Sequence, residues 1–249
     1  MKNIVFIPSR TGSTRVKNKN LQKFGKETLL SNKIKTCLKA NIGKVIVSTN
    51  SLKVLKYAER LGASCPFIRP KRYSTSRATT ISSILHYLRF LISKNNIIPE
   101  YLTLCPPTNP FLKPETLRKA FKVFKNEKFN SLVPITSPND HPFKFIKLKK
   151  QKIIFDTFKV NKLKWTDLER TQDWPKTYIA SSSFKICKTS YFLKYIKYKS
   201  PLFNKKAADI SSSMHYKITK IEDFDINNSY DIELANFILK NQKIQKSKF

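Results

Sequence analysis

The chain has 249 residues, of which 40% are hydrophobic, so it is long enough to bury a substantial core without disulfide or metal cross-links. Lysine and arginine outnumber aspartate and glutamate by 49 to 16, and the net charge of +33 predicts polyanionic or phosphorylated ligands. No apolar run approaches the roughly 20 residues of a transmembrane helix, and the apolar N-terminal stretch is too short for a signal peptide. We therefore expect a cytoplasmic protein that does not bind membranes. The four cysteines lie far apart without a Cys-x-x-Cys pair, which is typical of reduced thiols rather than a zinc site.

Residues 3–136 alternate between short apolar runs and stretches with helical periodicity. Asn3–Pro8 is a continuous apolar run, typical of a buried strand, and apolar side chains at helical spacing predict a helix over Thr28–Ala40. The same patterns predict strands at Lys44–Thr49, Ser64–Arg69, Tyr101–Cys105 and Ser131–Thr136, with helices at 52–61, 81–92 and 114–124. This alternation favours an α/β fold, with a mainly parallel sheet, helices on both faces, and functional loops at the carboxyl ends of the strands.

The region at about 143–164 breaks this alternation. Two short β-like pieces, Phe143–Leu148 and Ile153–Val160, are dense in lysine and phenylalanine. We interpret the region as an arm inserted into a single domain that spans residues 1–249, and its apolar side chains predict the contact of a homodimer. The chain ends with a strand-like run at Tyr216–Ile221, a turn at 225–228 and a helix over about Ser229–Lys240.

The segment from Pro8 to Leu21 carries the strongest chemical signal. It directly follows the first predicted strand, and around Gly12-Ser13 it gathers four cations, namely Arg10, Arg15, Lys17 and Lys19. A Gly-Ser turn exposes backbone N–H groups that can cradle an anion, and nearby cations can neutralise a triphosphate and its leaving pyrophosphate. The loop lacks the further glycines of a Walker loop or of a dinucleotide-binding motif. A solvated basic loop without a ligand is the alternative interpretation.

A series of motifs runs through nearly the whole chain. Residues 10–21 read Arg-x-Gly-Ser-x-Arg-x-x-x-Lys-Asn-Leu. They are followed by Phe24-Gly25-Lys26, Val47-Ser48-Thr49-Asn50, Gly62-Ala63, Arg69-Pro70, Pro107-Thr108-Asn109-Pro110, His141-Pro142, Arg170-Thr171-Gln172-Asp173-Trp174-Pro175 and Asp225-Ile226-Asn227. In this order and at this spacing, the motifs resemble those of the acylneuraminate cytidylyltransferases, the CMP-sialic acid synthetases.

The resemblance implies a Rossmann-like nucleotidyltransferase fold. It implies transfer of CMP from CTP to a nonulosonic acid, a nine-carbon α-keto acid sugar, with release of pyrophosphate, a requirement for Mg²⁺, and a homodimer with a small swapped arm. By resemblance, catalysis would depend on Lys19, Arg10 and Asp225, with Lys19 stabilising the α-phosphate. The nucleotide would be bound by Arg10, Gly12, Ser13, Arg15, Lys19, Asn20, Arg69 and Thr80, and the sugar by Thr108, Asn109, Arg170, Gln172 and Tyr178.

The chain departs from the family pattern at the metal and sugar sites. The family places two carboxylates one residue apart, which suits Mg²⁺, whereas this chain has Asp225 and Asn227. Asp225 is therefore the main expected metal ligand, with Asp223 and Asn227 beside it, although this cluster also suits a cap of the last helix. On the sugar side, Pro106 stands where the family has glutamine, Ser76 where it has aspartate, and Ser181-Ser182 where it has Asn-Gly. The identity of the nonulosonic acid is therefore open.

Three alternatives to this reading remain. The first is a 3-deoxy-manno-octulosonate cytidylyltransferase or another sugar nucleotidyltransferase, although Lys19-Asn20-Leu21, in place of Lys-Pro-Leu, favours the acylneuraminate branch. The second is an inactive family member, with which Asn227, Ser76 and Pro106 are consistent. The third is a basic nucleic-acid-binding protein, which requires a basic helix or an aromatic platform. We find neither in the sequence, and scattered lysines are also typical of an A/T-rich genome.

Overall fold

The computed structural model describes residues 3–12, 16–150, 152–154, 158–202 and 212–246. The chain divides into two compact units. The larger unit contains residues 1–134 and 181–249, and the smaller contains residues 135–180. The region expected at about 143–164 as an inserted arm falls inside the smaller unit.

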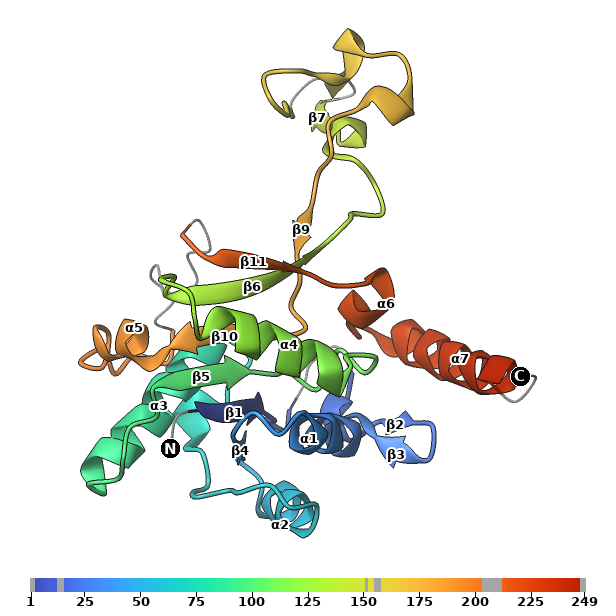
Figure 1. Ribbon diagram of the computed structural model, residues 1–249. Helices are drawn as coiled ribbons and strands as arrows, with labels where there is room; N and C mark the ends of the chain where they lie inside the picture. The colour runs from blue at the N-terminus through green and yellow to red at the C-terminus, as the bar shows by residue number, and fades with distance from the viewer. Residues whose placement is uncertain (1–2, 13–15, 151, 155–157, 203–211, 247–249) are drawn as a thin grey trace. The chain divides into compact units, whose positions relative to one another are not determined.

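The larger unit is built on a mixed sheet in which β1 is the second strand from one edge (Figure 1). Strand β1 (Asn3–Pro8) pairs in parallel with β4 (Lys44–Ser48) on one side and β5 (Tyr101–Leu104) on the other. Beyond β5, the sheet continues through β10, β6 and β11, and β10 is antiparallel to both β5 and β6. The bounds of these further strands are Ser131–Thr136 (β6), Lys185–Lys188 (β10) and Met214–Lys217 (β11).

Alternate side chains of β1 enter two different hydrophobic clusters, because successive residues of a strand point to opposite faces. Val5 and Ile7 pack into the cluster formed with α1, α2 and α4, whereas Ile4 and Phe6 pack into the cluster formed with α3 and α5. Helices therefore cover both faces of the sheet, as the strand–helix alternation predicts. Their bounds are Leu29–Ala40 (α1), Leu52–Arg60 (α2), Thr80–Ser93 (α3), Pro114–Phe124 (α4) and Thr189–Leu193 (α5).

The C-terminal part of the larger unit packs against the N-terminal part. Helix α7 (Ser229–Lys246) contacts the small hairpin of β2 (Lys23–Phe24) and β3 (Glu27–Thr28), and Asn236 Oδ1 accepts a hydrogen bond from Gly25 N at 2.7 Å. Ile226, just before this helix, is fully buried in a third cluster with Phe24 and Leu29. This packing brings the 223–227 turn to the same end of the sheet as the loop after β1.

Some sequence-based expectations need correction. Ser64–Arg69 forms two isolated bridges to the region of β4 instead of a full strand. The strand expected at Tyr216–Ile221 lies earlier, at Met214–Lys217, and the helix α6 (Lys220–Asp223) follows it. Thr219 caps α6 through a reciprocal capping box with Glu222, so helix capping overrides the β-like pattern there. Strand β10 was not predicted, because a four-residue run carries little periodicity.

The smaller unit consists of short elements. Strands β7 (Lys147–Lys149) and β8 (Lys152–Ile154) form an antiparallel hairpin, while Pro142–Lys144 is a 3₁₀ helix where extended structure was expected. His141 Nδ1 accepts a hydrogen bond from Phe143 N at 3.2 Å, and its Nε2 lies 2.8 Å from the carbonyl of Pro175. The ring also contacts Trp174, so His141 is fixed by packing and backbone contacts. Strand β9 (Ile179–Ala180) pairs with the end of β6 and completes this unit.

No helix of the described part of the chain combines the length and the apolar character needed to cross a bilayer.

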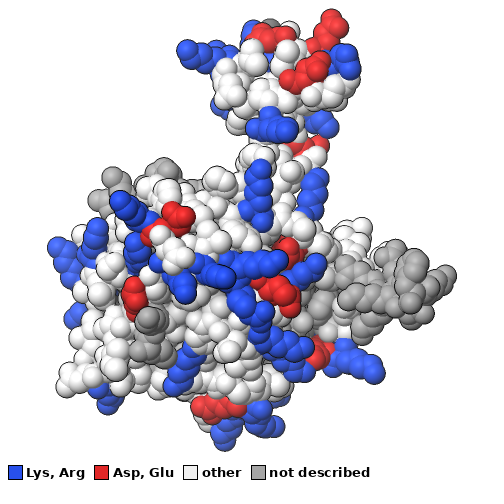
Figure 2. Space-filling view, in the orientation of Figure 1, with Lys and Arg blue, Asp and Glu red and all other residues white. Residues whose placement is uncertain are grey.

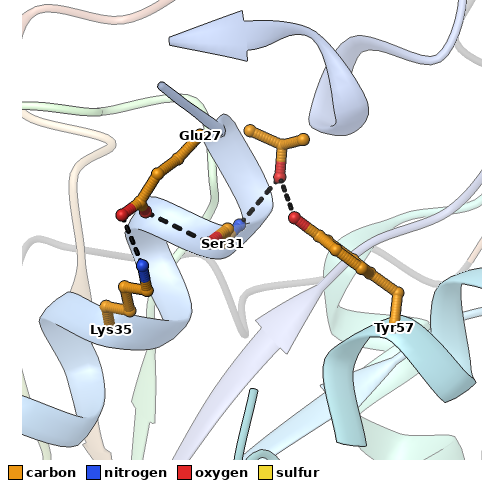
Figure 3. A network of polar contacts seen from close by, with 5 residues as sticks. Glu27, Ser31, Lys35 and Tyr57 are labelled. Carbon is orange, nitrogen blue, oxygen red and sulfur yellow. Dashed lines mark hydrogen bonds and ion pairs between the residues drawn. The ribbon is translucent and has the colours of Figure 1, made fainter. Parts of the chain in front are cut away.

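The start of α1 is held by a network of side chains that Figure 3 shows from close by. Thr28 caps the helix by accepting a hydrogen bond from Ser31 N at 3.0 Å, and its hydroxyl lies 3.1 Å from that of Tyr57 on α2. Glu27 accepts hydrogen bonds from Ser31 Oγ and from the ammonium of Lys35. Because the ion pair between Glu27 and Lys35 is partly exposed, we attribute more of the stabilisation to the cap.

Thr28→Ala removes this cap and the contact with Tyr57. We expect the free energy of unfolding to fall by about 1–2 kcal/mol, since loss of an N-cap side chain has this cost, and urea denaturation measures it. Thr28→Ser keeps the hydroxyl and should retain most of the stability. If the serine variant loses as much stability as the alanine variant, the cap is not the stabilising contact.

Candidate functional site

A cavity of about 370 Å³ lies in the larger unit, where the loops after β1 and β5 emerge. This position agrees with the general rule that ligands bind at the carboxyl ends of strands in open α/β sheets. The lining comes from four segments far apart in the sequence, and consists of Pro8, Arg10, Lys19, Asn20, Arg69, Tyr73, Ser76, Ala78, Thr79, Thr80, Pro106, Pro107, Thr108, Asp225 and Asn227.

The loop after β1 is fastened to its neighbours by hydrogen bonds. Asn50 Oδ1 accepts from Thr11 N at 2.9 Å and from the Thr11 hydroxyl at 3.2 Å, while Asn20 Nδ2 donates to Ser9 Oγ at 3.2 Å. Gly12 has a φ of +84°, a backbone conformation that favours glycine. It is not among the residues that line the cavity. The expected ligand contacts of Ser13 and Arg15 lie outside the described residues.

Among the described residues, three cations line the cavity. Arg10 Nη1 donates to the carbonyls of Ser74 (3.4 Å) and Thr75 (2.6 Å), so it links the loop after β1 to the segment before α3. The ammonium of Lys19 donates to the carbonyl of Ile226 at 2.7 Å, which ties the same loop to the C-terminal turn. The third cation is Arg69. Positive charge from two separate segments thus lines one space, which suits a ligand with several negative charges.

Arg69 is the most unusual of these cations, because it is only 3% exposed and its Nε and Nη2 have no hydrogen-bond partner among the described residues. Its backbone is fixed by a hydrogen bond from Arg69 N to the carbonyl of Thr49 at 2.7 Å. Burial, together with the nearby charge of Arg10, lowers the pKa of Arg69 to about 10, so the guanidinium remains charged at neutral pH. A buried, charged donor without a partner is costly unless an anion satisfies it.

The amino end of α3 adds to the positive character of the cavity. Thr79 caps this helix by accepting from Ser82 N at 3.2 Å, and both Thr79 and Thr80 line the cavity. The N-terminus of a helix carries a partial positive charge and favours anions. Sequence analysis named Thr80 but missed Thr79, Ala78 and Tyr73, although paired threonines before an apolar helix were a recognisable capping signal.

The 223–227 turn supplies the carboxylate of the cavity. Asp225 Oδ1 is buried and has no hydrogen-bond partner among the described residues, while Asp225 Oδ2 accepts from Asn227 Nδ2 at 3.2 Å. Asp223 does not line the cavity. Burial raises the pKa of Asp223 above its ordinary value, a hydrogen bond from Ser181 opposes this rise, and the charge of Asp225 adds to it.

The donor set of this turn fits Mg²⁺ in one particular way. The described residues contain no cluster of three His, Cys, Asp or Glu side chains that could enclose a metal ion. Mg²⁺ commonly takes one or two protein carboxylates and completes its shell with substrate phosphates and water. Asp225 lines the same cavity as the three cations, and its Oδ1 has no hydrogen-bond partner among the described residues, which matches this arrangement. Asp225 therefore fits the ion better than Asp223 does.

The residues expected to bind the sugar belong to both units. Thr108 lines the cavity, but Asn109 is fully buried, and its Nδ2 donates to the carbonyls of Asp223 (3.1 Å) and Phe224 (3.3 Å). Its amide therefore holds backbone instead of facing a ligand, which corrects the expectation for Asn109. Arg170, Gln172 and Tyr178 belong to the 135–180 unit, where their side chains are exposed. Arg170 there lies 3.8 Å from Asp173.

Charge at the surface differs in character from charge in the cavity. Figure 2 shows lysine and arginine at many separate places on the face in view, with fewer acidic residues among them. Exposed charges of this kind are screened by water and salt, whereas a buried guanidinium is screened much less. The buried Arg69 therefore indicates a binding site more strongly than the net charge does.

Arg69→Met removes the buried guanidinium at similar volume. We expect the dissociation constant for inorganic tripolyphosphate, measured by calorimetry, to rise about tenfold or more, because hydrogen bonds to a charged group contribute roughly 1.5–3 kcal/mol. Arg72→Met is the control, since Arg72 is exposed, stacks over Tyr73 and does not line the cavity. Equal affinities of the two variants would show that Arg69 does not face the anion.

Comparison with known proteins agrees with the motifs. The sequence matches the family model described as Cytidylyltransferase over residues 4–244. It is 30% identical over 126 residues to the CMP-N,N'-diacetyllegionaminic acid synthase of Legionella pneumophila, which covers 50% of this chain and 54% of that protein. It is 28% identical over 131 residues to the 3-deoxy-manno-octulosonate cytidylyltransferase of Rickettsia bellii, with 53% and 51% covered. To the N-acylneuraminate cytidylyltransferase of Escherichia coli it is 26% identical over 247 residues, with 98% and 53% covered.

The chain therefore spans about half the length of the curated relatives it matches. Among solved structures, CMP:2-keto-3-deoxy-manno-octonic acid synthetase complexed with CTP is similar with a TM-score of 0.69 at 9% identity, covering 97% of this chain and 100% of that chain. At so low an identity, the likeness concerns the fold alone, and it confirms the expected Rossmann-like nucleotidyltransferase fold. Since the family model covers nearly all of the sequence, the chain belongs to the cytidylyltransferase family.

Proposed function

We propose that this chain transfers CMP from CTP to a nonulosonic, sialic-acid-like α-keto acid sugar and releases pyrophosphate. The observation that carries the proposal is the cavity at the carboxyl ends of β1 and β5, where Arg10, Lys19 and the buried Arg69 surround a space next to Asp225. The names of two relatives, a CMP-N,N'-diacetyllegionaminic acid synthase and an N-acylneuraminate cytidylyltransferase, support the class of sugar.

In this reaction, the anomeric hydroxyl oxygen of the sugar forms a bond to the α-phosphorus of CTP. The bond from that phosphorus to the bridging oxygen breaks, pyrophosphate leaves with the bonding electrons, and the hydroxyl proton is released. The protein mainly has to align the groups in line and to stabilise the negative charge that moves to the leaving group. Fixed cations in a partly enclosed space do this without reorganisation during the reaction.

The positions of the cavity residues suggest a different role for each of them. We propose that Lys19 and Arg10 stabilise the phosphates, that Arg69 and Thr80 contact the nucleotide, and that Asn20 keeps the loop after β1 in place through Ser9. Asp225 would hold Mg²⁺ through its Oδ1, which has no hydrogen-bond partner among the described residues, with Asn227 beside it. When bound, the ion supplies further neutralisation of the phosphate charge. Thr108, which lines the cavity, remains proposed for the sugar together with Arg170, Gln172 and Tyr178.

A second candidate acceptor is 3-deoxy-manno-octulosonate, because a cytidylyltransferase named for that sugar is among the relatives. Pyrophosphate release from CTP, measured with this sugar and with a panel of nonulosonic acids in parallel, distinguishes the two. Release with a nonulosonic acid supports the main proposal, and release with 3-deoxy-manno-octulosonate alone supports the second. No release with any acceptor would favour an inactive family member.

Exhaustive treatment with EDTA is expected to abolish pyrophosphate release, and added Mg²⁺ or Mn²⁺ to restore it. The reason is that the carboxylate of Asp225, the single one lining the cavity among the described residues, would repel the triphosphate unless a divalent cation is bound between them. Undiminished turnover after removal of divalent ions would contradict the proposed role of Asp225.

Lys19→Ala is expected to lower kcat by about 10²–10³, because losing one preorganised group that stabilises transition-state charge has this effect. Lys17→Ala serves as the matched control, since Lys17 belongs to the same loop but is exposed and does not line the cavity. Arg170→Ala should raise the KM of the sugar and leave that of CTP unchanged. Turnover of the Lys19 variant close to that of the Lys17 variant would show that Lys19 is not catalytic.

We also propose a homodimer joined through the 143–164 region. Within it, Phe145, Ile146, Phe158 and Leu163 are 36–48% exposed, and exposed apolar side chains of this size commonly mark an interface. Light scattering at micromolar concentration should give twice the mass of the chain, and Phe145→Asp should reduce it to the monomer. A monomeric wild-type protein would contradict the proposal.

A further inference from the structure

Two loops far apart in the sequence are joined next to the cavity. Ile226 N donates to the carbonyl of Thr108 at 2.9 Å, and Asn109 Nδ2 donates to the carbonyls of Asp223 and Phe224 at 3.1 and 3.3 Å. The loop after β5 therefore holds the backbone on both sides of Asp225. Both amide hydrogens of Asn109 are used in this way, and the fully buried residue does not line the cavity, so its Nδ2 acts on the turn and not on a substrate, while its Oδ1 has no hydrogen-bond partner among the described residues.

A buried lysine of α1 donates a hydrogen bond to the backbone of Asn109. Lys33 of α1 is 0% exposed, and its ammonium donates to the carbonyl of Asn109 at 2.8 Å. The neighbouring Asn32 donates to the carbonyl of Pro110 at 2.8 Å, so α1 donates hydrogen bonds to two successive carbonyls of this loop.

An ammonium at this depth is expensive to bury. No ion pair of Lys33 is found within the described part of the chain. Burial lowers the pKa of Lys33, and the nearby Cys105, Cys37 and Asp225 oppose this lowering. An apolar side chain would fill the same position on the buried face of α1 at lower cost. The hydrogen bond to Asn109 is what distinguishes lysine from such a side chain, which indicates a role for that bond beyond packing.

We propose that Lys33 and Asn109 are positioning residues that aim Asp225 into the cavity. Lys33 fixes the backbone of Asn109, the amide of Asn109 fixes the carbonyls of Asp223 and Phe224, and the carboxylate of Asp225 that follows them is thereby held in the lining of the cavity. The inference rests on the proposed function, because it concerns the carboxylate that would hold Mg²⁺. Residues that orient a metal ligand typically change metal affinity by about 10–100-fold when they are replaced.

The test measures Mn²⁺ binding by electron paramagnetic resonance, with the full-length protein and saturating CTP and without any sugar. Lys33→Met and Asn109→Ala are each compared with Lys35→Met, which replaces a lysine of the same helix whose side chain is 47% exposed. We expect Mn²⁺ affinity to fall about tenfold or more in the first two variants and to stay unchanged in the Lys35 variant. In an assay with sugar, the KM of the acceptor should stay the same.

Thermal melting by circular dichroism shows whether each variant is folded. If Asn109→Ala fails to fold, Asn109→Leu, which has a similar volume but lacks the donor, takes its place. Folded variants whose Mn²⁺ affinity differs from that of the Lys35 control by less than about threefold would overturn the inference, as would a raised KM for the sugar with unchanged metal affinity. If the wild-type protein binds neither CTP nor Mn²⁺, it is the proposed function that fails, so the two failures are distinguishable.

Discussion

Burial of β1 on both faces is the constraint on which the rest of the structure depends. Residues 4–7 are completely buried, and their alternate side chains enter separate clusters on the two sides of the sheet. The backbone of the strand is hydrogen-bonded to β4 on one side and to β5 on the other. A strand held in this way cannot shift its register without exposing apolar side chains. The loop that follows Pro8 therefore leaves the sheet at a defined point, next to the loop that follows β5.

The electrostatic character of the site comes from burial more than from the number of charges. With a net charge of +33, cations near any cavity of this chain are unremarkable by themselves. Arg69 is different, because it is 3% exposed and two of its nitrogens have no partner within the described residues. Its charge acts in a medium that screens weakly, so it attracts an anion far more effectively than a surface lysine does. Asp225 differs from the cations, because it contributes a carboxylate to the lining of the same cavity and its buried Oδ1 has no hydrogen-bond partner within the described residues.

The site is completed only when distant parts of the chain meet. Lys19 and Ile226 are 207 positions apart, and Asn109 and Asp223 are 114 apart, yet each pair is joined by a hydrogen bond. The packing of α7 against the β2–β3 hairpin makes these contacts possible, because it places the 223–227 turn beside the loop after β1. The cations of the loop after β1 and the carboxylate of Asp225 therefore depend on the same long-range closure of the larger unit.

Local patterns were sufficient to predict much of this protein. Apolar runs and helical spacing located β1, β4, β5, β6 and the helices that cover them, because burial on one or two faces leaves a periodic trace in the sequence. Motif resemblance named Arg10, Lys19, Asn20, Arg69, Thr80 and Asp225, and the structure places all of them around one cavity. The antiparallel insertion of β10, the burial of Lys33 and the turn-holding contacts of Asn109 were not predicted. In the sequence, nothing distinguishes Lys33 from the other lysines of a lysine-rich chain, or Asn109 from other polar loop residues. Their roles depend on partners 76 and 114 positions away, and only the folded chain brings these groups within hydrogen-bonding distance.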